Sequence, residues 1–268
     1  MPVLCVLPAR IGSRRLPRKP LQPIAGHPLI EWSWRAASRV SDFGAVWVAT
    51  DSEEVTAAVG SFGGVAVLTS ERHESGTERV AEAARREEAR GFDVVVNFQA
   101  DEPFLDPRSV SAAVRTVREG EAPVATLAAP IRSREEWNSD SVVKVACTED
   151  GRALFFTRAG VPYVRDGVAA LDGHDPAFLR HIGLYVYTRE ALERWVSAPP
   201  TRLERIERLE QLRALECGLT IRVVLAEPSE LGVDEPADVR RAERLLRGRE
   251  GKRLDGAAGS YARCGHDR

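Results

Sequence analysis

A run of basic residues follows the first apolar segment of the chain and has the composition of a polyphosphate site. Residues 3–7 are apolar and predict a buried strand, and Arg10, Ser13, Arg15 and Lys19 come soon after it. Open α/β sheets bind ligands in loops at the carboxyl ends of their strands. A triphosphate needs several cations and backbone amides to hold it. The alternative is an ordinary solvated basic loop, which the position directly after a strand disfavours.

Lysine is scarce in this chain. Of 38 basic residues only Lys19, Lys144 and Lys252 are lysines, and the rest are arginines. Arginine offers a planar fork of donors, whereas lysine offers a compact point charge. A retained lysine therefore indicates a place where a point charge is wanted, and chance is the alternative explanation for any one of them.

Two aspartates follow predicted strands that lie far apart in the sequence. Asp101 comes after the apolar residues 93–98, and Asp234 comes after residues 221–226. Parallel strands end at one edge of a sheet, so we expect the two carboxylates to lie together. Mg²⁺ prefers oxygen ligands and typically uses one or two carboxylates plus phosphate oxygens. The pair predicts a Mg²⁺ site; the alternatives are a helix-start residue for Asp234 and an ordinary turn around Asp101.

Short apolar runs alternate with amphipathic segments over the first 120 residues. Strands are predicted at residues 3–7, 45–50, 65–68 and 93–98, and helices at 29–40, 53–59, 76–90 and 107–118. Continuous apolar strands between helices are typical of a parallel sheet that is covered on both faces. No GxGxxG segment follows the first strand, which disfavours a nicotinamide dehydrogenase.

The pattern changes after residue 120. Strands without long helices between them are predicted at residues 124–131, 142–147, 154–157 and 184–187, so we expect a smaller inserted sheet region at about 120–190. A capping box at Thr201 and Glu204 then opens one helix. Its apolar stripe consists of Leu203, Ile206, Leu209, Leu212 and Leu215. A last strand at 221–226 and a helix from Pro236 to about Leu246 complete the prediction.

Composition limits the classes of protein that remain. Hydrophobic residues make up 43% and charged residues 29% of 268, with a net charge of −2, so bulk charge favours neither nucleic acid nor a membrane surface. No apolar run reaches the roughly 20 residues of a membrane span. The four cysteines form no CxxC pair, which favours a reducing cytoplasm. We expect one domain over residues 1–247 and a disordered tail over 248–268.

The basic loop also carries a resemblance to a known family. Residues 8–21, Pro-Ala-Arg-Ile-Gly-Ser-Arg-Arg-Leu-Pro-Arg-Lys-Pro-Leu, closely resemble the N-terminal signature of the CMP-sugar-acid synthetases, in particular the 3-deoxy-manno-octulosonate (Kdo) cytidylyltransferases. Further segments match that family in order and spacing, at residues 49–51, 73–79, 97–103, 143–145, 156–158, 180–185, 209–213 and 232–236. Each match alone is weak, but together they are specific and reach almost to residue 247.

The resemblance implies a fold, a reaction and a site. The fold is a Rossmann-like nucleotide-diphospho-sugar transferase fold, and the inserted region forms a homodimer surface. The reaction is CTP plus Kdo giving CMP-Kdo and pyrophosphate, for lipopolysaccharide biosynthesis. Mg²⁺ is held by Asp101 and Asp234, and catalysis falls to Arg10, Lys19 and Asp101. The nucleotide is bound by Arg10, Ser13, Arg15, Lys19, His73, Ser75 and Gly76, and the sugar acid by Gln99, Arg158, His181, Tyr185, Glu210 and Gln211.

The chain departs from the family pattern at single positions, of which Ala100 and Glu235 bear on which sugar acid is used. Ala100 and Arg18 stand where the family usually has glycine, and Glu235 where it has threonine. The alternative acceptors are 8-amino-Kdo and N-acylneuraminate, although residues 156–158 and 209–211 favour Kdo over neuraminate. A non-catalytic nucleotide-binding protein is the alternative of another class. The joint presence of Lys19 and both aspartates argues against it, because simple binding needs no clamped α-phosphate.

Overall fold

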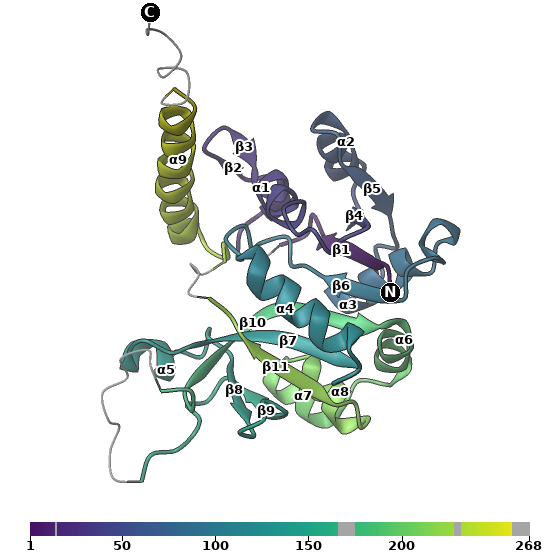
Figure 1. The fold of residues 1–268 in the computed structure, drawn as a ribbon, viewed down its shortest axis with the longest axis vertical. Helices are drawn as coiled ribbons and strands as arrows, with labels where there is room; N and C mark the ends of the chain where they lie inside the picture. Colours follow the sequence, from purple (N-terminus) through teal and green to yellow (C-terminus); the bar gives the residue numbers. More distant parts are fainter. Residues whose placement is uncertain (14, 166–174, 228–231, 259–268) are drawn as a thin grey trace, which may run out of the picture.

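A nine-stranded sheet forms the centre of the molecule in the computed structural model, which describes residues 1–13, 15–165, 175–227 and 232–258 (Figure 1). The strands lie in the order β11-β7-β10-β6-β1-β4-β5, and β8 and β9 extend the sheet beside β10. Their bounds are β1 Val3–Ala9, β4 Ala45–Thr50, β5 Val65–Leu68, β6 Val94–Asn97, β7 Val124–Pro130, β8 Lys144–Cys147, β9 Ala153–Thr157, β10 Leu179–Thr188 and β11 Ile221–Leu225. A separate hairpin consists of β2 Pro23–Ile24 and β3 His27–Pro28.

Helices cover both faces of this sheet, as the sequence predicted. Side chains of β1 alternate between two cores, with Leu4 and Val6 on one face and Val3, Cys5 and Leu7 on the other. The first core is closed by α3 Gly76–Ala84, α6 Arg189–Ser197 and α8 Gln211–Glu216. The second is closed by α1 Leu29–Ala37, α2 Glu53–Ser61 and α4 Pro107–Arg118. Two apolar faces require two layers of helix, which gives the three-layer α/β arrangement.

Strand β10 alone runs against its neighbours in the main sheet and connects it to the smaller one. Its C-terminal half lies between β6 and β7, with Tyr185 opposite Asn97, whereas its N-terminal half pairs with β8, with Arg180 opposite Lys144. The strands predicted at 124–131 and 184–187 therefore belong to the main sheet. The small antiparallel part that confirms the inserted sheet region consists of β8 and β9 beside the start of β10. The short helix α5 Arg134–Asn138 precedes it.

The single helix predicted from Thr201 is wrong, because the segment forms two short helices. The capping box at Thr201 is present and opens α7 Arg202–Glu207, but Arg208 adopts a left-handed φ of 55° and α8 starts anew. Leu203 and Ile206 are 39% and 66% exposed, so the apolar stripe is split. A buried ion pair holds the bend, since Arg213 of α8 donates to Glu204 of α7 at 2.5 and 2.8 Å.

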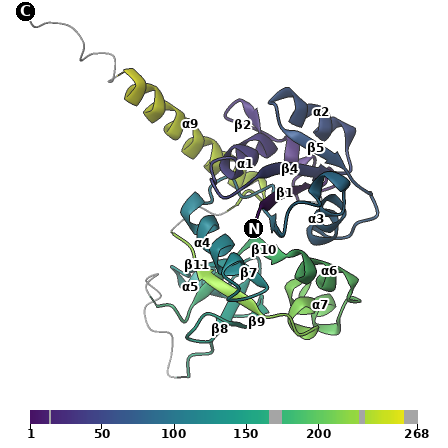
Figure 2. The ribbon, with the colours of Figure 1, turned by 45° about the vertical axis from the view of Figure 1, so that its right-hand side comes forward.

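The last helix, α9 Pro236–Ala258, is longer than the sequence predicted and projects from the body (Figures 1 and 2). The backbone of residues 248–258 is helical where an irregular tail was expected, and residues 259–268 lie outside the described part of the chain. Charged residues such as arginine and glutamate favour a helix even without an apolar stripe, which explains the error. Among the described helices, none is long and apolar enough to cross a membrane.

The bend between α7 and α8 depends on the buried pair of Arg213 and Glu204. We expect Arg213→Met to lower the free energy of unfolding by about 3–5 kcal/mol, since it leaves a buried carboxylate without its partner. Urea denaturation measures the change. Arg202→Met on the exposed side of α7 is the control and should alter stability by less than about 0.5 kcal/mol. Equal effects of the two substitutions would contradict the role assigned to the pair.

Candidate active site

A polar pocket of about 600 Å³ opens at the edge of the sheet where β1 and β6 end. It is lined by most of the residues that the sequence singled out as candidates. These are Arg10, Ser13, Arg15, Lys19, His73, Ser75, Gly76, Gln99, Asp101, Glu210 and Asp234. The other lining residues are Pro8, Ala9, Gly12, Pro20, Glu74, Arg79 and Ala100. The predicted phosphate, base and metal residues thus converge on one cavity.

Lys19 joins the two predicted metal ligands. Its ammonium donates to the carboxylate of Asp101 and, at 2.7 Å, to Oδ1 of Asp234, which also accepts from Arg15 at 3.1 Å. The backbone brings the two aspartates together, because Val233 N–H donates to the carbonyl of Asp101 at 2.9 Å. A Cβ at Gly232 would lie 2.9 Å from the same carbonyl oxygen, so this approach requires glycine.

The charges of this cluster support one another. Burial opposes the charge on Lys19, but the neighbouring carboxylates of Asp101 and Asp234 outweigh it and raise the pKa of the ammonium. Burial likewise opposes the charge on Asp234, but Lys19 and Arg15 hold the pKa of that carboxyl below its usual value. Burial and the adjacent Asp101 raise the pKa of Glu102 to about 8. Lys19 therefore acts as a resident cation between two carboxylates.

The donor set fits a divalent cation of the hard, oxygen-seeking class. Asp101 and Asp234 already hold a positive charge between them, in the form of the Lys19 ammonium. No group of three or more His, Cys, Asp or Glu side chains arranged for a metal occurs among the described residues. Two carboxylates with room for water or phosphate oxygens suit Mg²⁺, which keeps several such ligands, better than a closed all-protein cage.

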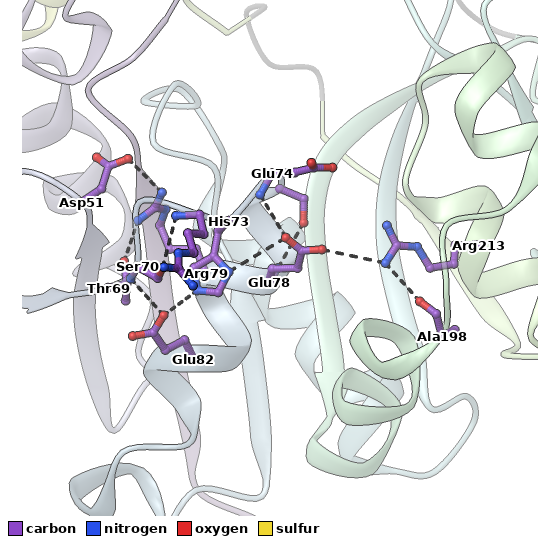
Figure 3. A network of polar contacts seen from close by, with 12 residues as sticks. Asp51, Thr69, Ser70, His73, Glu74, Glu78, Arg79, Glu82, Ala198 and Arg213 are labelled. Atoms are coloured by element: carbon purple, nitrogen blue, oxygen red, sulfur yellow. Dashed lines mark hydrogen bonds and ion pairs between the residues drawn. The ribbon is translucent and has the colours of Figure 1, made fainter.

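A buried arginine fixes the basic loop that follows β1. Arg79, 2% exposed on α3, donates to Asp51 at 2.9 Å and to Thr69 at 2.6 Å (Figure 3). The other oxygen of Asp51 accepts the backbone N–H of Ile11 at 3.1 Å. The loop after β1 is thereby tied to the ends of β4 and β5. Sequence reasoning missed the roles of Asp51 and Arg79, although both lie in segments that match the family.

Two glutamates of α3 hold the segment that precedes this helix, which carries His73 and lines the pocket. Glu82 accepts from the backbone N–H of Ser70 at 3.0 Å and lies 2.5 Å from Nε2 of His73, and Glu78 accepts from the N–H of Glu74 at 3.0 Å (Figure 3). Partial burial opposes the charge on Glu82, but the bonds from Ser70 and His73 hold its pKa below the usual value. Ser75 caps α3 by accepting from Glu78 N–H at 3.1 Å. Side-chain hydrogen bonds from α3 therefore fix the conformation of the segment before it.

The residues assigned to the sugar acid divide into two groups. Gln99 and Glu210 line the pocket, whereas Arg158, His181, Tyr185 and Gln211 do not. Tyr185 and His181 continue from the pocket along β10, because Tyr185 lies near Glu210 and its ring centroid is 5.4 Å from that of His181. Gln211 is buried at the start of α8. Their role in acceptor binding stays a prediction.

Burial sets the protonation of two residues that lie outside the pocket, Tyr185 and His181. It raises the pKa of Tyr185 and lowers that of His181 to about 3, so both side chains are neutral at pH 7. His181 Nε2 lies 2.9 Å from Oγ1 of Thr126 on β7. Neutral donors and acceptors of this kind suit sugar hydroxyls rather than phosphates.

The departures from the family pattern have different structural weights. Arg18 adopts a left-handed φ of 55°, a conformation that favours the glycine usual there, and pairs with Glu54. Ala100 is not among the described residues of positive φ, and its carbonyl accepts from Ser33 at 2.7 Å. Glu235 is exposed, and its N–H donates to Asp238. The substitution at Ala100 is therefore mild for the backbone.

Comparisons with known proteins agree with this geometry. Residues 4–221 match the cytidylyltransferase family. The chain is 45% identical to 3-deoxy-manno-octulosonate cytidylyltransferases of Syntrophobacter fumaroxidans and Gemmatimonas aurantiaca, over 89% and 90% of this chain and 94% and 93% of the relatives. A solved structure of CMP:2-keto-3-deoxy-manno-octonic acid synthetase complexed with CTP superposes with a TM-score of 0.84 at 37% identity, covering 93% of this chain and 100% of the other.

A second solved structure shows likeness of fold alone. It is 4-diphosphocytidyl-2C-methyl-D-erythritol synthase from Anaerococcus prevotii, with a TM-score of 0.57 and 14% identity over 92% of this chain and 96% of that one. At that identity the comparison supports the α/β architecture and carries no argument about the site.

The low pKa of Asp234 depends on Lys19 and Arg15, which gives a direct test of the cluster. We expect Lys19→Met to raise this pKa, as followed by carboxyl ¹³C titration. The pKa of Asp234 is lower in the folded protein than in the unfolded chain. The pairing therefore stabilises the fold at pH values above the unfolded pKa, and this stabilisation is lost as the pH falls through the folded pKa. Arg18→Met, which removes a cation of the same loop that pairs with Glu54, should leave Asp234 unchanged. A larger change in the pKa of Asp234 from Arg18→Met than from Lys19→Met would contradict the role assigned to Lys19.

Proposed function

Because the chain belongs to the cytidylyltransferase family, within the group of 3-deoxy-manno-octulosonate cytidylyltransferases, we propose that it transfers CMP from CTP to Kdo and releases pyrophosphate. One observation carries the proposal more than any other. Lys19 and the carboxylates of Asp101 and Asp234 meet in a pocket whose other wall is the basic loop after β1. A pocket that only bound a nucleoside would not need this arrangement.

The reaction forms one bond and breaks one. The anomeric hydroxyl oxygen of Kdo attacks the α-phosphorus of CTP, the bond from that phosphorus to the bridging oxygen breaks, and pyrophosphate leaves while the hydroxyl proton passes to solvent or base. Such a step depends on in-line positioning and on charge neutralisation. Arg10, Ser13 and Arg15 line the pocket where the phosphates would lie. Lys19 supplies a point charge for the α-phosphate once it releases a carboxylate.

The metal proposal rests on the donor set at the strand ends. Asp101 and Asp234 would hold Mg²⁺, with phosphate oxygens and water as further ligands. When bound, the ion would offset negative charge on the phosphate oxygens. The protein's own part is to fix the two carboxylates, through the Val233–Asp101 backbone bond and the close approach at Gly232.

The acceptor would lie on the side of the pocket formed by Gln99 and Glu210. Beyond them Tyr185 and His181, whose ring centroids are 5.4 Å apart, lie along β10. Hydrogen bonds from Thr77 and Ser75 favour the charged form of Glu210, although burial dominates and raises its pKa. Buried polar groups that must be paired by substrate hydroxyls give strong discrimination between acceptors.

The wider biological setting is also a proposal. The family resemblance supports a homodimer formed through the inserted region at about residues 120–190 and a product used in lipopolysaccharide biosynthesis. Cys5, Cys147 and Cys217 are free thiols, which accords with a reducing cytoplasm.

A substrate panel tests the reaction and its acceptor together. The protein with CTP and Mg²⁺ should release pyrophosphate with Kdo, and the rate should fall by at least about tenfold with 8-amino-Kdo or N-acylneuraminate, because the polar acceptor pocket discriminates by unpaired groups. A coupled pyrophosphate assay gives the rates. Faster turnover with one of the other two acids would identify that acid, and not Kdo, as the substrate. No release with any acid would favour a non-catalytic nucleotide-binding protein.

Removal of one carboxylate tests the metal assignment. We expect Asp101→Asn to lower kcat by roughly a hundredfold or more, since a metal ion contributes several kcal/mol of charge stabilisation. Raised Mg²⁺ should partly restore the rate, which a simple loss of fold would not allow. Asp42→Asn, at a partly buried aspartate that pairs with Arg118 instead of Lys19, is the control and should keep full activity. Full activity of Asp101→Asn would refute the assignment.

A further inference from the structure

Lys144 is a fully buried lysine that the reaction as described leaves without a role. It has no exposed surface, and its ammonium donates to three backbone carbonyls, those of Ser139 and Val142 at 2.7 Å each and that of Arg158 at 2.5 Å. An ammonium has three N–H donors, so all of them are used. These contacts join the segment before β8 to the turn after β9.

The chemistry of this position favours lysine over the arginine that the chain uses almost everywhere else. Three carbonyl oxygens converge on one point, which a tetrahedral ammonium can serve and a planar guanidinium cannot. Burial and the neighbouring Arg158 lower the pKa of Lys144, so the charge is kept at a cost. Burying a cation whose hydrogen bonds go only to carbonyls is expensive, but a hydrophobic side chain would leave the three carbonyl oxygens without a donor. The charge therefore holds these carbonyls, including that of Arg158, at one point.

The group that Lys144 holds is Arg158, which is fixed at four points. Its carbonyl binds Lys144, its N–H donates to the Glu207 carboxylate at 3.0 Å, its Nε donates to the Glu207 carbonyl at 3.0 Å, and its Nη1 donates to the Asp140 carbonyl at 2.8 Å. Asp140 lies in the segment whose carbonyls at Ser139 and Val142 also bind Lys144. The lysine thus fixes both the backbone of Arg158 and the surface on which its guanidinium rests.

The same strand contacts the acceptor side of the site. Lys144 lies opposite Arg180 of β10, and the N–H of His181 donates to the carbonyl of Val143 at 2.8 Å. A loss of the Lys144 contacts would therefore act on Arg158, whose carbonyl the ammonium binds, whereas the basic loop that faces the phosphates follows β1. A change at Lys144 should therefore alter the binding of the sugar acid and leave the binding of the nucleotide unchanged.

We propose that Lys144 is a positioning residue for the sugar acid, whose three carbonyl contacts set Arg158 in place to bind the substrate carboxylate. The inference rests on the proposed transfer of CMP to a sugar acid. A guanidinium held in advance loses little freedom on binding, so an anionic acceptor is bound more tightly. Arginine binds carboxylates with planar, paired hydrogen bonds, whose strength depends on its orientation.

Kinetics of Lys144→Met test the proposal. We expect the KM for Kdo to rise by about tenfold or more, the size of effect for one charge-assisted hydrogen bond, while the KM for CTP changes by less than about twofold. The double variant with Arg158→Ala should be no worse in KM for Kdo than Arg158→Ala alone, because the lysine acts through the arginine. Arg152→Met, at an exposed cation next to β9, is the control and should match the parent protein.

Three results would overturn the proposal. These are equal rises of both KM values, multiplicative effects in the double variant, and an unchanged KM for Kdo in a folded Lys144→Met protein. If that variant does not fold, hydrogen exchange on the parent protein decides instead. Kdo should slow exchange at residues 157–159 and at the His181 amide, and no slowing would refute the assignment. A parent protein that turns over no sugar acid would refute the proposed function itself.

Discussion

An ammonium held between two carboxylates organises the ligand edge of this protein. Lys19 ends the loop that follows β1, Asp101 follows β6, and Asp234 follows β11. Three segments remote in sequence are therefore joined by charge at one point. The pairing offsets the repulsion between the two carboxylates. Glycine at 232 and the bond from Val233 to Asp101 supply the backbone geometry that makes it possible.

Different helices and strands hold the segments around this cluster in place. Helix α3 braces the basic loop and the segment before the helix, since Arg79 holds Asp51 and Thr69 while Glu82 holds Ser70 and His73 (Figure 3). The region proposed for the acceptor is braced by β8, β9 and α7, where backbone carbonyls rather than carboxylates receive most of the arginine and lysine donors. Preformed hydrogen-bond partners of both kinds reduce the ordering cost of binding.

Sequence patterns predicted the elements whose signals are local. The strand at Ala45–Thr50 and the helix at Pro107–Arg118 were predicted because their apolar patterns extend over a few neighbouring positions. The bend at Arg208 was missed because a helical stripe says nothing about a residue with positive φ. The part played by Arg79 was missed because its partners lie 10 and 28 positions away. Long-range pairing, rather than local propensity, decides those features.

The direction of β10 has a consequence for how the sheet is built. Its neighbours in the main sheet, β6 and β7, run the other way, so the connection from β9 reaches β10 at the ligand edge (Figure 1). The second half of β10 pairs with β6, so the register between β1 and β6 does not depend on where the first half of β10 begins. The first half is therefore free to carry β8 at its side. One antiparallel strand thus joins a second, smaller set of strands to the sheet without disturbing the parallel ones.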